Sequence, residues 1–415
     1  MWSINKTVVN TISLASIQAA NALFPLLVFP YLFLVFGETE FSHIVIAEAI
    51  SLYILAVSLY SFDVLGVRYV IEDLESGRDG LTYYVNILAL RTLLFFIIAV
   101  PALAIIYFTL NDYFLIFSIW LLFVVGSILQ SNYYFQALEN NVVLAMVIVL
   151  SRLAAVLFIY MYVVGEGDTN LAVLLLAGSF FVSGVVSFFY VILTQAFTLR
   201  DVDRGLMFRL LIEGKEIFIG NISVALFRGA NVLILSVVSN ASAVAVYSLA
   251  EKFIKSWQAV ARPLNQVFIP KVIKAWSKLA LAEKSNQKAF EIVWQYSRIQ
   301  IVLMLLSIPI VFFVIGLAST FELLSGFSNE TFILIAIMSL SVVSGIANAM
   351  FGAVGLSLID SQRYFAYSVM MVGFSSMLFS FVASYYFQAR GGALAYVLSE
   401  CLLLLVFIVK YRRSK

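Results

Sequence analysis

The chain has 415 residues, of which 63% are hydrophobic and 12% are charged. Soluble domains carry about 25% charged residues, so this composition excludes an ordinary soluble enzyme. A membrane-spanning helix needs about 20 mostly apolar residues, and the chain holds enough of them for about a dozen spans joined by short connections. The net charge of +2 leaves no electrostatic footprint for nucleic-acid binding, and one cysteine and one histidine exclude zinc clusters and disulfide frameworks. The sequence therefore predicts an all-α polytopic membrane protein.

Apolar runs separated by charged residues, glycine or asparagine predict about twelve membrane-spanning helices. In chain order their ranges are 8–36, 41–65, 84–109, 113–136, 142–164, 170–195, 215–239, 243–270, 296–317, 331–356, 363–387 and 391–411. The polar segment 197–213 divides six helices from six, which predicts two six-helix bundles, residues 1–205 and 206–415. An offset of 203 residues places Ala47-Glu48 on Ala250-Glu251, each in an even-numbered helix, which favours a duplication.

The distribution of Lys and Arg predicts the orientation of the spans. Placing the N-terminus in the cytoplasm puts seventeen of the 25 Lys and Arg residues in the inside segments and only Arg390 in the outside loops. Cytoplasmic loops carry such an excess of positive charge, so both termini are predicted to be cytoplasmic. The outer loops are too short for a domain outside the membrane.

The other seven cations and four acids fall within the predicted spans. The cations are Arg91, Arg152, Arg228, Lys252, Lys255, Arg262 and Arg298, and the acids are Glu48, Asp63, Glu251 and Glu400. A charged side chain at the bilayer centre costs about 2.5–3.5 kcal/mol on insertion scales, so such residues usually face a wet cavity or a partner. Arg91, Arg298 and Asp63 lie within about two turns of the predicted cytoplasmic surface, where a long side chain can also reach water, so both interpretations stay open for them.

The deeper cations predict an anionic cargo. Arg152, Arg228, Lys252 and Lys255 lie near mid-membrane, and the spacing of residues 252, 255 and 262 gives one helix a cationic stripe. Glu251 is one turn from Lys255 and can neutralise it, but seven cations exceed four acids, and Arg and Lys suit a phosphate headgroup. The alternative is that each cation pairs with an acid.

The four acids are also candidates for exchanging a coupling ion, H⁺ or Na⁺. Glu48 and Glu400 are the remaining deep acids, and a salt bridge to a cation is the alternative for each. The sequence has no Walker A motif, so no ATP site is predicted, and no cofactor is expected.

Five segments resemble bacterial polysaccharide flippases of the O-antigen type. They are PLLVFPYLFLVFG at 25–37, SFDVLGVR at 61–68, SNYYFQALE at 131–139, VYSLAEKF at 246–253 and PLNQVFIPK at 263–271. The sequence departs from the family pattern at Tyr133-Tyr134, where an Asp-Trp pair is common.

The resemblance implies the fold of multidrug exporters and lipid II flippases, with two helical bundles around a central cavity that work by alternating access. It implies an undecaprenyl-diphosphate-linked O-antigen repeat unit as cargo, moved from the cytoplasmic to the periplasmic leaflet of the bacterial inner membrane, in some members by ion antiport. Membrane lipid, the O-antigen polymerase and the chain-length regulator are the implied partners.

A multidrug antiporter and a membrane enzyme are the alternatives to a flippase. A multidrug antiporter of the same fold would favour an acidic cavity for organic cations. A membrane enzyme, such as an O-antigen polymerase or a glycosyltransferase, would need large outer loops with catalytic residues, so the chain is not expected to be an enzyme.

Overall fold

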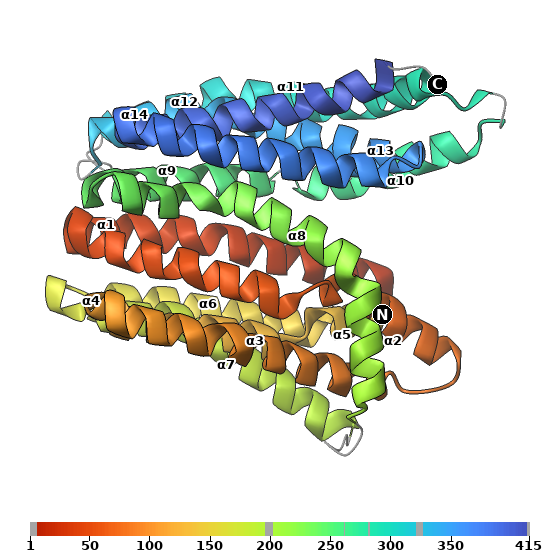
Figure 1. Cartoon of the computed structure of the whole chain (residues 1–415), viewed down its shortest axis with the longest axis horizontal. Helices are drawn as coiled ribbons and strands as arrows, with labels where there is room; N and C mark the ends of the chain where they lie inside the picture. Colours follow the sequence, from red (N-terminus) through yellow and green to blue (C-terminus); the bar gives the residue numbers. More distant parts are fainter. Residues whose placement is uncertain (1–5, 196–201, 261, 281–282, 321–326, 413–415) are drawn as a thin grey trace, which may run out of the picture. The chain divides into compact units, whose positions relative to one another are not determined.

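The computed structural model describes residues 6–195, 202–260, 262–280, 283–320 and 327–412, without the side chains of residues 6, 7, 195, 226–228, 260, 262–264, 266 and 267. The described residues are overwhelmingly helical (Figure 1), which confirms the predicted fold class. The first helices are α1 (Lys6–Leu59), α2 (Phe62–Glu75), α3 (Leu81–Thr109), α4 (Asn111–Gln130), α5 (Asn132–Ala137), α6 (Asn141–Tyr162), α7 (Thr169–Gln195) and α8 (Arg204–Val238). The others are α9 (Ala241–Val260), α10 (Arg262–Ser277), α11 (Asn286–Thr320), α12 (Asn329–Asn348), α13 (Gly355–Leu358) and α14 (Gln362–Arg412).

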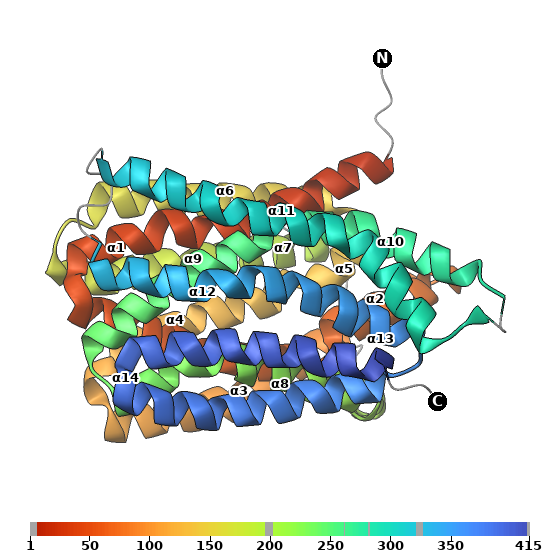
Figure 2. The same cartoon turned by 90° about the horizontal axis from the view of Figure 1, so that it is seen from above.

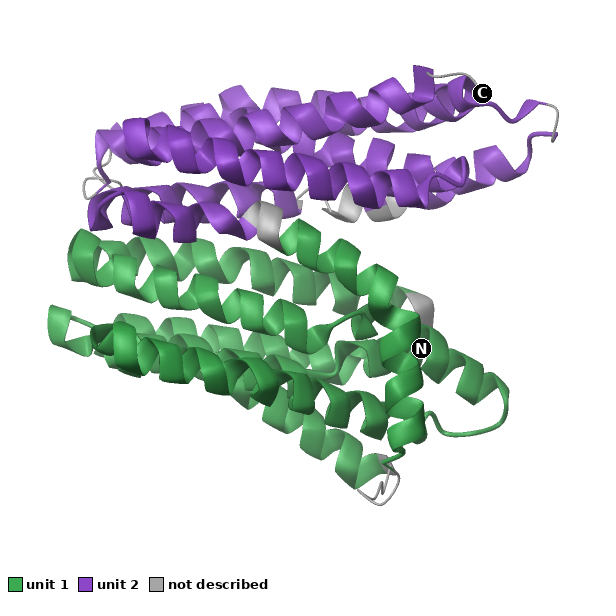
Figure 3. Ribbon diagram, in the orientation of Figure 1, with its two compact units in different colours: residues 1–225 green, residues 226–415 purple. Residues whose placement is uncertain are grey.

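The chain forms two compact units, residues 1–225 (unit 1) and 226–415 (unit 2), as Figure 3 shows. The boundary lies inside α8, downstream of the division predicted after residue 205. The first part of α8 packs in unit 1 because Tyr60 holds it there. The Tyr60 hydroxyl donates a hydrogen bond to the carbonyl of Leu211 at 2.9 Å, and its ring stacks on Phe218 with 4.3 Å between the centroids.

The first two predicted spans form a single helical hairpin, α1. The chain reverses at Gly37, whose φ of 66° and ψ of −174° lie in a region that is essentially restricted to glycine. The ring centroids of Phe29 and Phe41 are 6.1 Å apart, whereas twelve residues of straight helix would separate these positions by about 18 Å.

The last two predicted spans form a second hairpin, α14. Its break is at Gln388, with φ 49° and ψ −131°. The two arms lie side by side in Figures 1 and 2, and the Tyr364 hydroxyl of one donates a hydrogen bond to the Val406 carbonyl of the other at 3.1 Å.

The helices account for the predicted spans. In the described part of the chain, 8 helical segments are long and apolar enough to cross a membrane, and the bent α8 makes 9. Two of these segments contain the hairpins α1 and α14, which hold two predicted spans each. The remaining span corresponds to α9 and α10, where Glu251, Lys252 and Lys255 lower the apolar character of α9. The chain is therefore a multi-pass membrane protein.

Close helix packing positions the polar side chains of unit 1. The helices α4 and α7 approach so closely that a Cβ atom on Gly184 would overlap the carbonyl oxygen of Gly126. Small residues permit such contacts between membrane helices, where dispersion and hydrogen bonds replace the hydrophobic effect as the driving force. The contact fixes α7 between α4 and α6 and so orients the residues that α7 presents to α6.

Candidate functional site

Arg152 lies on α6 inside unit 1 and is only 3% exposed. Its Nη1 donates a hydrogen bond to the hydroxyl of Ser179 on α7 at 2.9 Å. The guanidinium carbon lies 3.4 Å from the centroid of the Phe180 ring, also on α7, and 5.5 Å from that of Phe24 on α1. Three helices therefore enclose one permanent cation between a hydroxyl and two aromatic rings.

These partners of Arg152 are all neutral. No carboxylate of the described residues forms an ion pair with it, and its Nε–H has no hydrogen-bond acceptor there. A desolvated cation–π contact contributes about 2 kcal/mol, and a hydrogen bond to a charged group about 1.5–3 kcal/mol. Burying an isolated charge costs considerably more, so the described structure leaves Arg152 incompletely compensated.

Arg91, on α3, is a buried cation that has a counter-charge. Its Nη2 donates a hydrogen bond to Oδ1 of Asp63, in the first turn of α2, at 2.8 Å. The Arg91 side chain is 1% exposed and that of Asp63 is 55% exposed. Arg91 also lies 4.9 Å from the centroid of the Tyr133 ring, which packs against Gly66. Arg91 therefore does not reach the surface itself, whereas its acidic partner does.

The aromatic pair Tyr133-Tyr134 is fully buried. The Tyr134 hydroxyl donates a hydrogen bond to the backbone carbonyl of Asp79 at 3.4 Å. The two residues that depart from the family pattern therefore pack in unit 1 around α2 and α3.

In unit 2, Lys255 and Glu251 form the ion pair that their spacing predicts, with 3.0 Å between Nζ and Oε2. Lys252 is half-buried, and it too has an interaction partner. The helix α9 ends before Arg262, and the side chains of Arg228 and Arg262 lie outside the described residues. The predicted stripe is therefore described only as far as Lys255.

Glu400, on the second arm of α14, is fully buried and lies against an amide. The Nδ2 of Asn348, the last residue of α12, donates hydrogen bonds to Glu400 Oε2 at 2.6 Å and to the Glu400 carbonyl at 2.9 Å. The Asn348 Oδ1 has no hydrogen-bond donor in the described residues. Directly after Asn348 the helix widens into a π-helical turn, Ala349–Val354, a feature that is frequent at functional sites.

The two remaining candidates lie apart from these contacts. Glu48 is half-buried on the second arm of α1 and has an interaction partner. Arg298 is exposed on α11 and makes no ion pair with any described residue. Among the described candidates, the structure thus joins Arg91 to Asp63 and Lys255 to Glu251.

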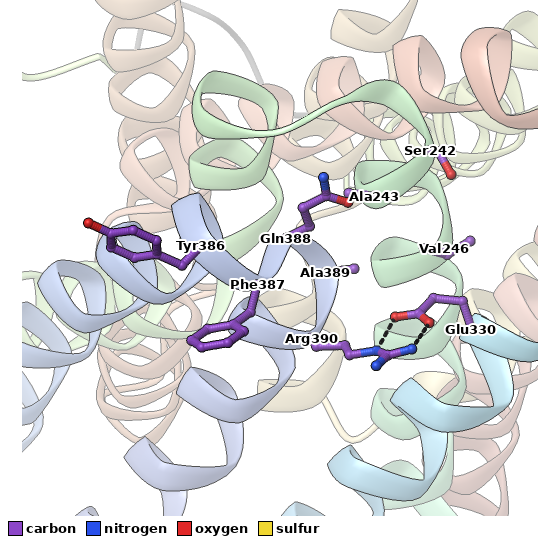
Figure 4. Close-up of a pocket in the computed structure, with 9 residues that line it drawn as sticks. All are labelled: Ser242, Ala243, Val246, Glu330, Tyr386, Phe387, Gln388, Ala389 and Arg390. Carbon is purple, nitrogen blue, oxygen red and sulfur yellow. Dashed lines mark hydrogen bonds and ion pairs between the residues drawn. The ribbon is translucent and has the colours of Figure 1, made fainter.

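Sequence reasoning missed a pocket of about 340 Å³ at the break in α14 (Figure 4). It lies between this break and the beginnings of α9 and α12. Arg390 spans one side with a forked ion pair to Glu330, its Nε 2.8 Å from Oε1 and its Nη2 2.6 Å from Oε2. A signal was present, because Arg390 is the one cation in the predicted outer loops and Glu330 is an acid in a neighbouring loop.

A family model described as polysaccharide biosynthesis protein matches residues 7–276. The chain belongs to this family. Among its relatives, a protein of Escherichia coli (strain K12) named "Putative O-antigen transporter" is 22% identical over 98% of this chain and 97% of its own length. A protein of the same name from Shigella dysenteriae is 22% identical over 96% of this chain and 98% of its own length. The family predicted from the short motifs is thereby confirmed.

Solved structures of MATE transporters share the fold of this polysaccharide biosynthesis protein. An inward-facing MATE family transporter of the MOP superfamily matches with a TM-score of 0.71 at 14% identity, over 95% of this chain and 94% of that one. A eukaryotic MATE transporter matches with a TM-score of 0.61 at 15% identity, over 99% and 96% of the two chains. At this identity the likeness establishes the fold alone.

Proposed function

We propose that this chain is a flippase that moves an undecaprenyl-diphosphate-linked oligosaccharide, the O-antigen repeat unit or a similar glycan, from the cytoplasmic to the periplasmic leaflet of the inner membrane. Family membership, the name of the two relatives and the transporter fold support the transport of a polysaccharide precursor. In this proposal both termini are cytoplasmic, as the distribution of Lys and Arg predicts.

The observation that carries the proposal is the buried guanidinium of Arg152, whose described partners are all neutral. A guanidinium presents five N–H donors in a planar fork that matches phosphate oxygens, and that of Arg152 makes only one hydrogen bond to the described residues. A diphosphate that reached this guanidinium would supply the missing negative charge. Because Arg152 is 3% exposed, the cargo must first displace the Phe24 ring of α1 or the Phe180 ring of α7.

Arg228, Lys252, Lys255 and Arg262 are the proposed diphosphate-binding cations of the second half of the chain. Lys255 is already paired with Glu251, so in this proposal it exchanges the Glu251 carboxylate for the diphosphate when the cargo binds. Arg91 is held by Asp63 in the same way in unit 1.

Glu400 is the proposed site of ion exchange. A carboxylate that is fully buried against Asn348, beside a π-helical turn, is costly to keep charged, so taking up H⁺ or Na⁺ there would couple readily to a change in helix packing. Glu48, half-buried on α1, is the second candidate.

A multidrug antiporter is the second candidate function, because the fold matches such transporters. Organic cations need an acidic site, and Arg152 without a carboxylate partner in the described residues opposes one. The two functions therefore differ in the charge of the substrate, which is anionic for the flippase and cationic for the antiporter.

Complementation tests the proposal. A strain that lacks its own flippase and makes the cognate lipid-linked repeat unit receives the wild-type chain, Arg152→Ala, Arg152→Lys or the control Arg298→Ala, all at native expression. The wild type and Arg298→Ala should restore surface polysaccharide. Arg152→Ala should abolish it while the protein still inserts, and Arg152→Lys should restore only part because an ammonium lacks the fork.

The leaflet that holds the lipid-linked intermediate completes the test. Accumulation of the intermediate on the cytoplasmic side in Arg152→Ala cells is the expected result. Normal polysaccharide in Arg152→Ala cells would overturn the anion site, and failure of the wild type with its cognate substrate would favour the exporter.

A further inference from the structure

The pocket at the break in α14 combines polar groups from three helices of unit 2. In Figure 4 the Gln388 side chain extends from the break towards the start of α9, and Arg390 turns towards Glu330 at the start of α12. Ser242 lies on the α9 side, and Tyr386 and Phe387 are exposed on the α14 side. The volume of about 340 Å³ is near the lower end of the range for small-molecule sites.

The charges in this pocket cancel, which indicates a neutral ligand. Both carboxylate oxygens of Glu330 accept hydrogen bonds from the Arg390 fork, so neither an anion nor a cation finds an uncompensated opposite charge there. The Gln388 amide both donates and accepts hydrogen bonds, as does the Ser242 hydroxyl. Arg390 retains further N–H donors, and Glu330 retains lone pairs. Groups that both donate and accept are the complement of hydroxyl groups on a ligand.

The backbone at Gln388 has a conformation that is strained for a residue with a side chain. Its φ of 49° with ψ of −131° lies outside the regions that residues with a side chain normally occupy. The hairpin α1 makes its reversal with glycine, at Gly37, where a positive φ carries no such strain. Glycine would therefore suit position 388 better for folding alone. Strained residues of this kind cluster at ligand sites, where the side chain is needed.

We propose that this pocket binds sugar hydroxyl groups of the glycan portion of the cargo, through Gln388, Arg390, Glu330 and Ser242, with Tyr386 and Phe387 forming an apolar rim. The proposal rests on the proposed function for the nature of the cargo. It adds a glycan subsite in unit 2, at the end of α9 that the distribution of Lys and Arg predicts to lie outside, ten residues along α9 from Lys252.

Protection of a cysteine in the pocket tests the proposal. Cys401 is the one cysteine of the chain, so Ser242→Cys in a Cys401→Ser background gives a single reporter. The purified full-length protein in nanodiscs is labelled with a maleimide, with and without the oligosaccharide released by mild acid from the lipid-linked fraction of the native cells. Ser319→Cys, exposed near the end of α11, is the matched control.

The released oligosaccharide should slow the labelling of Ser242→Cys and leave Ser319→Cys unaffected. Gln388→Ala and Gln388→Gly should each raise the concentration needed for half-protection by about two- to tenfold, the equivalent of one neutral hydrogen bond. Gln388→Gly should do so while its thermal stability equals or exceeds that of the parent, which separates lost binding from lost folding.

Absence of protection by the oligosaccharide, or unchanged protection in Gln388→Gly, would overturn the glycan pocket. The same nanodisc protein, moved to vesicles, is assayed for transfer of the intact lipid-linked fraction between leaflets. Transfer without protection would leave the flippase function standing and reject the pocket alone, whereas protection without transfer would reject the proposed function.

Discussion

The ion pair between Arg91 and Asp63 predicts an unequal response to removing either partner. Asp63→Asn leaves a guanidinium that is 1% exposed without its counter-charge. Breaking a buried pair in this way costs about 3–5 kcal/mol, and because Asp63 is 55% exposed we expect the lower end, about 3 kcal/mol of unfolding free energy. Arg91→Met removes the buried charge, keeps an unbranched apolar chain against Tyr133 and leaves a carboxylate that water can solvate, so we expect a loss of no more than about 1 kcal/mol.

Equilibrium unfolding in mixed micelles measures both free energies. The exposed pair of Arg68 and Glu72, with side chains 70% and 51% exposed, is the control, and Glu72→Gln should leave the free energy of unfolding nearly unchanged. A loss for Arg91→Met that equals or exceeds the loss for Asp63→Asn would refute the reasoning, because it would mean that the pair stabilises the unit by attraction rather than by neutralising Arg91.

Two further predictions concern packing and ion exchange. Gly184→Ala should lower the thermal stability in detergent because its Cβ would overlap the Gly126 carbonyl. The control Gly178→Ala, with nothing within 4 Å of its Cβ, should be neutral or stabilising. Equal effects of the two substitutions on thermal stability would contradict the packing argument. Glu400→Gln should keep the contact with Asn348 and fold normally but make transport insensitive to the coupling-ion gradient in vesicles. Asn348→Leu should lower stability by about 1–3 kcal/mol because it removes a hydrogen-bond donor from a buried carboxylate. A gradient-dependent Glu400→Gln protein would exclude Glu400 as the exchange site.

The helices could be predicted from the sequence because their signals are local. An apolar run of sufficient length must become a helix in a bilayer, where every backbone group needs an internal partner. Gly37 is itself the kind of residue that marks a reversal, so the first hairpin has a visible signal. Gln388 has none, since glutamine is common inside helices and its backbone conformation follows from the packing of the two arms of α14.

Whether an ion pair could be predicted depends on how far apart its two residues lie along the chain. Glu251 and Lys255 are one helical turn apart, and their ion pair follows from helix geometry alone. Arg91 and Asp63 are 28 residues apart, and their pairing depends on how α2 packs against α3. The sequence shows which predicted span holds each charged residue, but not which residue of another helix it will meet.

Asn348 shows the same limit for an uncharged partner. It lies 52 residues from Glu400, and an amide in an apolar span carries no sign of which acid it will meet. The boundary between the units was likewise hidden, because the length of α8 is local information, while its contact with Tyr60 is not.

Arg152 gives the sharpest separation between what stabilises the fold and what the function requires. Its guanidinium is 3% exposed and has only neutral partners in the described structure, so the folded chain bears a desolvation cost that no described counter-charge offsets. Replacing buried charges by apolar residues of similar volume is often neutral or stabilising, by up to about 4 kcal/mol. Arg152→Met should therefore unfold at an equal or higher temperature than the wild type, with its side chain packed between Phe24 and Phe180, and yet restore no surface polysaccharide. An Arg152→Met protein that is markedly less stable would show that the cation contributes to the structure, and one that is stable and active would show that the cargo does not need it.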